Sequence, residues 1–250
     1  MLLKSKVALV TGAGQGVGRG IALALAAEGA RVAVTGRTLE KLEATCAVIK
    51  ERGGEALPVV CDVKSAPSLA QCVAAVLEEF GAINILVNNA QEVPLGTLQQ
   101  VTDDSFAAGW ESGPLATFRM MKLCYPHLKG GGCIINLASA AAKRWDMSGY
   151  GAYAATKEAI RSLTRAAACE WGPEGIRANV ILPHAMSPGM QWWMDNNPDE
   201  AAEFVATIPQ RRVGDCEEDI GRFVTVLCGD ASAYVNGQSI ALDGGQAYLG

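Results

Sequence analysis

Tyr153 and Lys157 lie four residues apart in a segment, 150–171, whose apolar spacing predicts a helix. Side chains at this spacing share one helix face, so we expect the phenol and the ammonium to be neighbours. A free phenol has a pKa near ~10, and both a nearby ammonium and a cationic nicotinamide ring would lower it. The pair is therefore predicted to act as a general acid/base on an alcohol or ketone. The alternative is a chance YxxxK on an ordinary amphipathic helix. It is weakened because Ser139 ends an apolar run 14 residues earlier.

A second chemical motif is the glycine-rich segment TGAGQGVG at 11–18, which follows one apolar run and opens a helical pattern. Gly12 permits a tight turn, Gly16 lets the backbone approach a pyrophosphate, and Gly18 lets the helix pack closely on the strand. The free N–H groups and positive potential of the helix N-terminus favour a phosphate there. The segment predicts a dinucleotide site, with a glycine-rich turn without a ligand as the alternative.

The residues after the second and third apolar runs bear on the choice of dinucleotide. An NAD site usually places Asp or Glu about 20 residues beyond the loop, on the ribose 2′-hydroxyl, but Gly36 and Arg37 stand there. A missing anion and an added cation favour the 2′-phosphate of NADP(H), with NAD(H) as the alternative because Arg37 can also stack on adenine. Asp62 is placed to accept a hydrogen bond from the adenine amino group, or else to cap the next helix.

Short apolar runs alternate with helical patterns along the whole chain. The runs predict buried strands at 6–11, 31–35, 56–61, 83–88, 133–138, 178–182 and 239–242, and the early helices are expected at 17–28, 39–51 and 68–80. This alternation predicts parallel βαβ units in a doubly wound open sheet with helices on both faces. Ligands should bind beyond the carboxyl ends of its strands. The segment 183–209 is expected to be irregular.

Composition narrows the class of protein. The 250 residues are 50% apolar and 19% charged, which predicts one folded domain over residues 1–250. A net charge of −5 with no basic run disfavours nucleic acid. The eight cysteines show no CxxC or zinc-ligand spacing, so we expect reduced thiols and no metal. The chain has no signal peptide pattern and no apolar window that could span a membrane, and a cytoplasmic location is expected.

Taken together, the motifs resemble those of the short-chain dehydrogenase/reductases, in their compact single-domain branch. The resemblance covers essentially the whole chain and rests on TGAGQGVG at 11–18, Asp62, NNAQ at 88–91, Ser139, YAATK at 153–157 and DGG at 243–245. It implies a seven-stranded Rossmann-type sheet in the order 3-2-1-4-5-6-7. It also disfavours the enoyl reductases of the family, whose tyrosine and lysine lie farther apart.

The resemblance also implies roles for individual residues. Tyr153 becomes the catalytic acid/base, Ser139 binds the substrate oxygen, and Lys157 holds the nicotinamide ribose and tunes Tyr153. The residues that it places around the cofactor are Gly12, Gln15, Gly16, Val17, Gly18, Arg37, Asp62, Val63, Asn89, Ala90, Tyr153, Lys157, Pro183 and Met186.

Three departures from the family pattern fall near the expected site. Gln91 replaces the glycine of NNAG and is predicted to contact the substrate. After the sixth strand, PHAMSP at 183–188 has His184 and Pro188 where the family has glycine and threonine. Gly113, followed by Pro114, stands where the family carries a catalytic asparagine that positions a water behind Lys157. Ser112 or a second water would have to replace that asparagine.

The segment 184–212 is predicted to be a substrate lid. Trp192 and Trp193 within it suit a bulky apolar substrate, or alternatively packing against a partner subunit. The resemblance further implies a homotetramer built from the helices at 106–128 and 153–171 and the last strand.

The predicted function is an NADP(H)-preferring oxidoreductase that interconverts an apolar secondary alcohol and a ketone. The alternative is a nucleotide-binding scaffold or sensor with little turnover.

Overall fold

The strands form one parallel sheet in the order β3-β2-β1-β4-β5-β6-β7, in a computed structural model that describes residues 1–143 and 149–249. The strands are β1 (Val7–Thr11), β2 (Arg31–Gly36), β3 (Glu55–Val60), β4 (Ile85–Asn88), β5 (Cys133–Leu137), β6 (Arg177–Pro183) and β7 (Ser239–Leu242). The predicted fold class and strand order are confirmed. Strand ends differ from the prediction by at most two residues.

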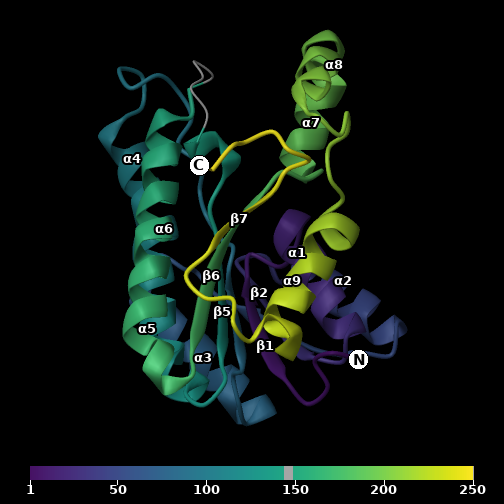
Figure 1. Cartoon of the computed structure of the whole chain (residues 1–250), viewed down its shortest axis with the longest axis vertical. Coiled ribbons are helices and arrows are strands. Elements are labelled where there is room, and N and C mark those ends of the chain that lie inside the picture. The colour runs from purple at the N-terminus through teal and green to yellow at the C-terminus, as the bar shows by residue number, and fades with distance from the viewer. Residues whose placement is uncertain (144–148, 250) are drawn as a thin grey trace.

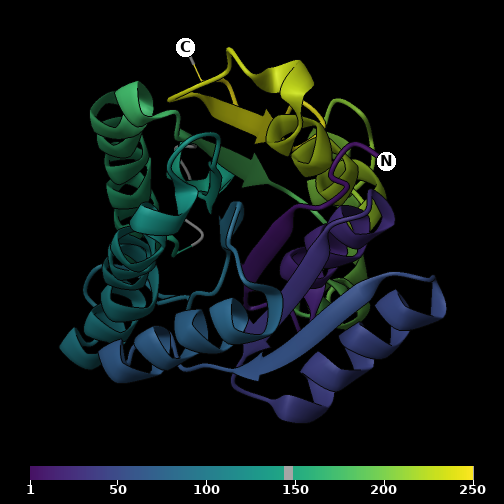
Figure 2. The ribbon, with the colours of Figure 1, turned by 90° about the horizontal axis from the view of Figure 1, so that it is seen from below.

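Helices cover both faces of the sheet (Figures 1 and 2). One layer contains α1 (Gly16–Ala27), α2 (Leu39–Glu51) and α9 (Arg222–Cys228), and the other contains α3 (Ala66–Phe80), α5 (Ala116–Leu128) and α6 (Gly151–Trp171). Successive residues of β1 point to opposite layers, so Val10 packs with α1 and α2 while Leu9 packs with α3 and α5. A strand buried on both faces must be apolar throughout, which explains the unbroken runs in the sequence.

The helix expected at 106–128 is divided in two. It consists of α4 (Asp103–Trp110), a π-helical turn (Glu111–Leu115) and α5. Pro114 lies inside the π turn. Proline has no N–H to donate and its ring clashes with the preceding turn, so a wider turn is a local solution. The proline thus coincides with the interruption of the α-helix, and Gly113 lies buried beside it.

The prediction of irregular chain at 183–209 is wrong. Two helices, α7 (Pro188–Asn196) and α8 (Pro198–Thr207), occupy most of it and stand beyond the carboxyl end of β6 (Figure 1). The Ser187 hydroxyl caps α7 by accepting a hydrogen bond from the Met190 N–H at 3.2 Å. Pro188 and Pro198 stand at the first position of each helix, where proline is favoured.

The remaining elements are short. They are a second π-helical turn (Cys216–Gly221) and 3₁₀ turns at Ala140–Ala142, Gly172–Glu174 and Asp230–Ser232. Across residues 1–143 and 149–249, we find no helix whose length and apolar character would let it pass through a membrane.

Candidate active site

Three of the predicted residues meet at the carboxyl end of β5. Helix α6 carries Tyr153 and Lys157, and Ser139 follows the strand. The buried Nζ of Lys157 donates a 2.7 Å hydrogen bond to the carbonyl of Leu137 and lies 5.3 Å from the centre of the Tyr153 ring. The Ser139 hydroxyl accepts a hydrogen bond from the Ala141 N–H at 3.2 Å and forms another with the side chain of Tyr153. A phenol, a hydroxyl and an amine therefore share one small region.

Burial dominates the electrostatics of this region. It raises the pKa of Tyr153 to about 12, although the hydrogen bond with Ser139 works in the opposite direction and Tyr150 adds a small further rise. Burial also lowers the pKa of Lys157 to about 7. An amine with that pKa carries only part of its positive charge at neutral pH. In the protein alone, desolvation therefore outweighs the lowering of the phenol pKa by Lys157 that the sequence predicts.

The glycine loop is held by Asn89. Its side-chain Nδ2 donates hydrogen bonds to the carbonyls of Thr11 (2.8 Å) and Gly12 (3.1 Å). A Cβ atom at Gly12 would lie 2.7 Å from this nitrogen, and one at Gly18 only 2.4 Å from it. Gly12 also has φ +66°, in the left-handed region that favours glycine. Gly12 and Gly18 are therefore needed because Asn89 packs against them, whether or not a cofactor is bound. The spacing of the glycines in the sequence does not reveal this reason.

The loop keeps an open cradle at Gly16. Its φ is +56°, and the nearest atoms that a Cβ would meet belong to Ser187 and Pro188, 3.5 Å away on the segment that begins α7. The first turn of α1 contains no acidic residue. The free N–H groups of this helix end and the absence of nearby acid in that turn fit a pyrophosphate. The residues present are therefore those that a dinucleotide needs.

The other predicted cofactor contacts line the same edge of the sheet. The Gln15 side chain accepts a hydrogen bond from Lys41 Nζ at 2.6 Å, and the Ala90 N–H donates to Thr11 Oγ1 at 3.1 Å. Pro183 is the last residue of β6. The Met186 N–H donates a hydrogen bond to the Gly214 carbonyl at 2.8 Å. Val17 and Val63 are both partly buried, packed against different core clusters. Their contacts with a cofactor stay predictions.

Asp62 does not cap α3, so that alternative is wrong. The cap is Ser65, whose hydroxyl accepts the Ser68 N–H at 3.3 Å. Asp62 Oδ1 instead accepts the N–H of Lys64 at 3.0 Å. The Lys64 side chain and that of Arg37 both reach Glu92, a residue that sequence reasoning missed. Its only signal in the sequence was its place directly after NNAQ.

Gln91 fills the space above Gly113. A Cβ at Gly113 would lie 2.6 Å from Gln91 Nε2, and that nitrogen donates a 2.6 Å hydrogen bond to Thr156 Oγ1 on α6. Among the described residues, the buried Oε1 of Gln91 has no hydrogen-bond partner. The replacements at 91 and 113 are therefore in contact. Contact between Gln91 and a substrate stays a prediction.

Ser112 has a structural task. Its hydroxyl donates to the Ala108 carbonyl at 2.7 Å and accepts the Glu92 N–H at 2.9 Å. These bonds tie the π turn to the loop after β4. That Ser112 or a second water replaces the family's asparagine stays a prediction.

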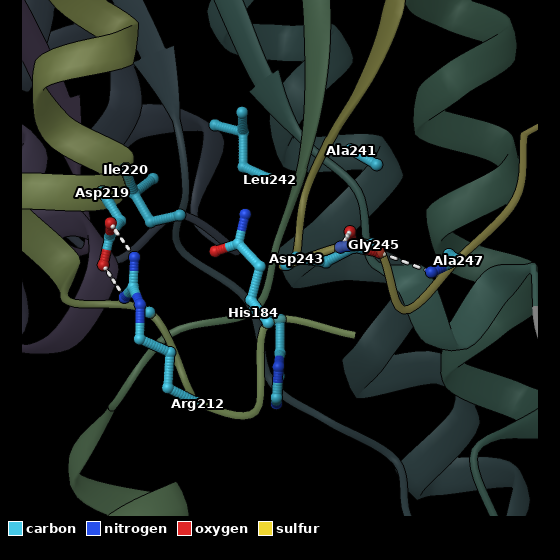
Figure 3. A pocket seen from close by; sticks show the side chains of 12 residues that line it. His184, Arg212, Asp219, Ile220, Ala241, Leu242, Asp243, Gly245 and Ala247 are labelled. Atoms are coloured by element: carbon cyan, nitrogen blue, oxygen red, sulfur yellow. Dashed lines mark hydrogen bonds and ion pairs between the residues drawn. The ribbon is translucent and has the colours of Figure 1, made fainter. Parts of the chain in front are cut away.

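A cavity of about 370 Å³ lies at the carboxyl ends of β6 and β7 (Figure 3). Its charged groups are already paired: Arg212 makes two bonds of 2.5 and 2.7 Å to Asp219, and the Asp243 carboxylate accepts the N–H groups of Gly245 and Ala247. The wall of this cavity therefore resembles a closed structural network more than a site built for a charged ligand.

An aromatic row connects the cavity to the predicted lid. The ring of His184 meets Phe204 edge to face at 5.3 Å, and Phe204 meets Trp193 in the same way at 5.7 Å. Trp193 on α7 therefore packs against Phe204 of α8, whereas Trp192 is 66% exposed. Contact between either tryptophan and a substrate stays a prediction.

Comparison with known proteins finds relatives described as reductases or dehydrogenases. A family model described as enoyl-(acyl carrier protein) reductase matches residues 12–247. A 12α-hydroxysteroid dehydrogenase from Clostridium sp. is 39% identical, over 98% of this chain and 97% of that protein. A hydroxynaphthalene reductase-like protein from Metarhizium robertsii is 33% identical, over 97% and 95%. A solved short-chain dehydrogenase from Burkholderia cenocepacia, in complex with NADP, is 30% identical with a TM-score of 0.91, over 98% of this chain and 99% of that chain.

Proposed function

The chain belongs to the short-chain dehydrogenase/reductase family and is an NAD(P)-dependent alcohol dehydrogenase or carbonyl reductase, for which we propose NADP(H) as the preferred cofactor and a bulky apolar ketone or secondary alcohol as substrate. The observation that carries the assigned reaction is the meeting of Ser139, Tyr153 and Lys157 at the carboxyl end of β5, on the same edge of the sheet as the glycine loop after β1.

In the proposed chemistry, the bound nicotinamide supplies or accepts the hydride. The protein supplies the proton. For reduction, the Tyr153 hydroxyl donates its proton to the carbonyl oxygen while the Ser139 hydroxyl donates a hydrogen bond to the same oxygen. Lys157 Nζ lies 5.3 Å from the centre of the phenol ring. When Lys157 is protonated, its positive charge stabilises the phenolate that forms on Tyr153. Oxidation of the alcohol uses the same groups in reverse.

The preference for NADP(H) is supported by the cations after β2 and β3. Arg37 and Lys64 both pair with the carboxylate of Glu92, and no acidic residue occupies position 36. A related structure holds NADP. A 2′-phosphate provides acceptor oxygens for such cations, which a 2′-hydroxyl cannot do to the same extent.

The substrate class is supported by the relatives and by the lid. The names of two relatives refer to hydroxysteroids and hydroxynaphthalene, both fused-ring compounds. The segment 184–212, with its helices α7 and α8, is our proposed lid, and exposed Trp192 is the aromatic group in it that is free to meet a ligand. Loops after a strand that close over a ligand are common in enzymes.

The test is turnover on a panel that holds fused-ring ketones, small ketones and an enoyl thioester, each with NADPH and NADH. We expect reduction of fused-ring ketones with NADPH to have the highest kcat/KM. Reduction of the enoyl thioester alone would replace the carbonyl assignment with that of an enoyl reductase. Binding of cofactor without turnover on any ketone or alcohol would favour the scaffold alternative.

A homotetramer is proposed on separate grounds. Phe106 and Trp110 on α4 stack with ring centres 6.4 Å apart, and these two side chains and Phe118 on α5 are each about two-fifths exposed. Exposed apolar surface on these two helices is what a subunit interface would cover, and it supports the proposal. Light scattering after size exclusion tests the assignment, and a monomeric mass would reject it.

A further inference from the structure

Arg37, Lys64 and Glu92 come from three different strands but meet at one point. They follow β2, β3 and β4 respectively. Because the sheet order is β3-β2-β1-β4, the strands before Arg37 and Glu92 stand on either side of β1. A contact between these two residues therefore crosses the carboxyl end of β1, where the glycine loop begins. This is the place where an adenosine must enter.

A single carboxylate serves both cations. Arg37 Nη1 lies 3.0 Å from Glu92 Oε1, and Lys64 Nζ lies 3.1 Å from Oε1 and 3.3 Å from Oε2. The side chain of Glu92 is one-third exposed, so solvent and ligands can reach it. A carboxylate that bridges two cations has the same charge pattern that a phosphate would present to them.

The backbones of two of the three residues are held by neighbouring side chains, and the side chain of the third extends into solvent. The Glu92 N–H is held by Ser112, and the backbone of Lys64 is held by Asp62 at its N–H and by Arg119 at its carbonyl. The side chain of Arg37, in contrast, is 64% exposed. Releasing both cations from Glu92 therefore needs only rotations of side chains that are at least partly exposed, without any change in the backbone.

We propose that Glu92 is an internal anion that holds Arg37 and Lys64 until the 2′-phosphate of NADP(H) replaces it, and that it thereby sets the affinity for the phosphorylated cofactor. This inference rests on the proposed preference for NADP(H). A phosphate monoester carries up to two negative charges and three acceptor oxygens, so it competes successfully with one carboxylate. NAD(H) brings no anion to this point, and the contact with Glu92 then persists or is lost without replacement.

The proposal predicts the sign of the change in affinity for the 2′-phosphate when Glu92 is replaced. Removal of the carboxylate frees both cations, so the 2′-phosphate should bind more tightly. If Glu92 instead oriented Arg37 for the phosphate, its removal would weaken binding. A passive surface ion pair would leave the affinity unchanged.

The test compares Glu92→Gln with wild type by calorimetric titration of 2′,5′-ADP and 5′-AMP, which differ in the 2′-phosphate, and of NADPH and NADH. Glu40→Gln is the control, because Glu40 is an exposed acid in the first turn of α2, close to Arg37 in sequence, and its substitution removes the same charge. We expect Glu92→Gln to bind 2′,5′-ADP and NADPH about three- to fivefold more tightly, the size that partly exposed charge contacts allow. Binding of 5′-AMP and NADH should change by less than about twofold, as should all binding to Glu40→Gln.

Unchanged or weaker binding of 2′,5′-ADP by Glu92→Gln would overturn the inference, as would an equal gain in Glu40→Gln. A second variant, Glu92→Ala, must reproduce the gain for the inference to stand. The proposed function fails separately. If wild type bound NADH more tightly than NADPH while Glu92→Gln still gained affinity for 2′,5′-ADP alone, the cofactor preference would be wrong and the role of Glu92 would stand.

Discussion

Lys157 and Arg37 are two cations at the same edge of one sheet, in opposite surroundings. Lys157, whose side chain reaches from α6 to the end of β5, is 3% exposed, and burial lowers its pKa to about 7. The side chain of Arg37 is 64% exposed and keeps an acidic partner at 3.0 Å. The region around Lys157 excludes water from the amine and so changes its protonation. The region around Arg37 leaves the guanidinium in contact with solvent, where it can exchange one anionic partner for another.

This difference suits the two tasks that we assign to the regions. Proton transfer needs groups whose pKa values can move, and burial moves them. Ligand exchange needs contacts that are weak enough to break, and solvated ion pairs typically contribute only about 0–1 kcal/mol. The following changes test whether the two regions differ in this way.

The largest effect is expected at the buried region, on activity. Tyr153→Phe removes one hydroxyl and should lower kcat by about 10²–10⁴-fold, the usual contribution of a general acid/base. Cofactor affinity, measured by titration, should stay near that of wild type. A variant that keeps more than half of the wild-type kcat would remove Tyr153 from the chemistry.

The second change concerns stability and pH at Lys157. The folded protein has a Lys157 pKa near 7 and the unfolded chain has the ordinary value of 10.5, so between these values the unfolded state binds more protons. The free energy of unfolding contributed by this group should therefore rise with pH, by up to about 1.4 kcal/mol per pH unit. Lys157→Met should lack this rise. Denaturant titrations of both proteins from pH 7 to 9 measure the difference, and parallel curves would show that burial does not shift this amine.

The third change probes the packed contact between Gln91 and Gly113. Gly113→Asn would place a Cβ 2.6 Å from Gln91 Nε2, which donates to Thr156, and should lower the free energy of unfolding by roughly 1–3 kcal/mol, as overpacked sites do. Gln91→Ala combined with Gly113→Asn should recover part of that loss. Additive losses in the double variant would mean that the two positions act independently. A stable Gly113→Asn enzyme with a higher kcat would instead restore the family's asparagine to a working role.

The smallest effect is expected at the exposed region. Arg37→Ala should weaken the binding of NADPH by about three- to fivefold with little change for NADH, because only NADPH has a 2′-phosphate to pair with. Added salt should reduce the advantage of wild type, since exposed charges are screened. Equal losses for both cofactors would indicate stacking on adenine. An effect that salt does not alter would remove the distinction between the two regions.

Local pattern was sufficient for most of the fold. Continuous apolar runs and helical spacing located all seven strands and the early helices, because burial on both faces requires an unbroken apolar strand. They failed at α7 and α8, where prolines that begin helices resemble prolines that end them. The strand order came from motifs held in common with a family, since periodicity does not state which strands are neighbours.

The candidate site divides in the same way. Spacing along a helix brought Tyr153 and Lys157 to one face, and the ends of strands placed Ser139 and the glycine loop at one edge. Only the tertiary structure decided that Gln91 covers Gly113 and that Glu92 reaches across β1 to Arg37. It also decided that burial, more than the neighbouring charge, controls the pKa of Tyr153. Such contacts join loops that are distant in sequence, and desolvation depends on every surrounding element, so neither leaves a periodic trace in the chain.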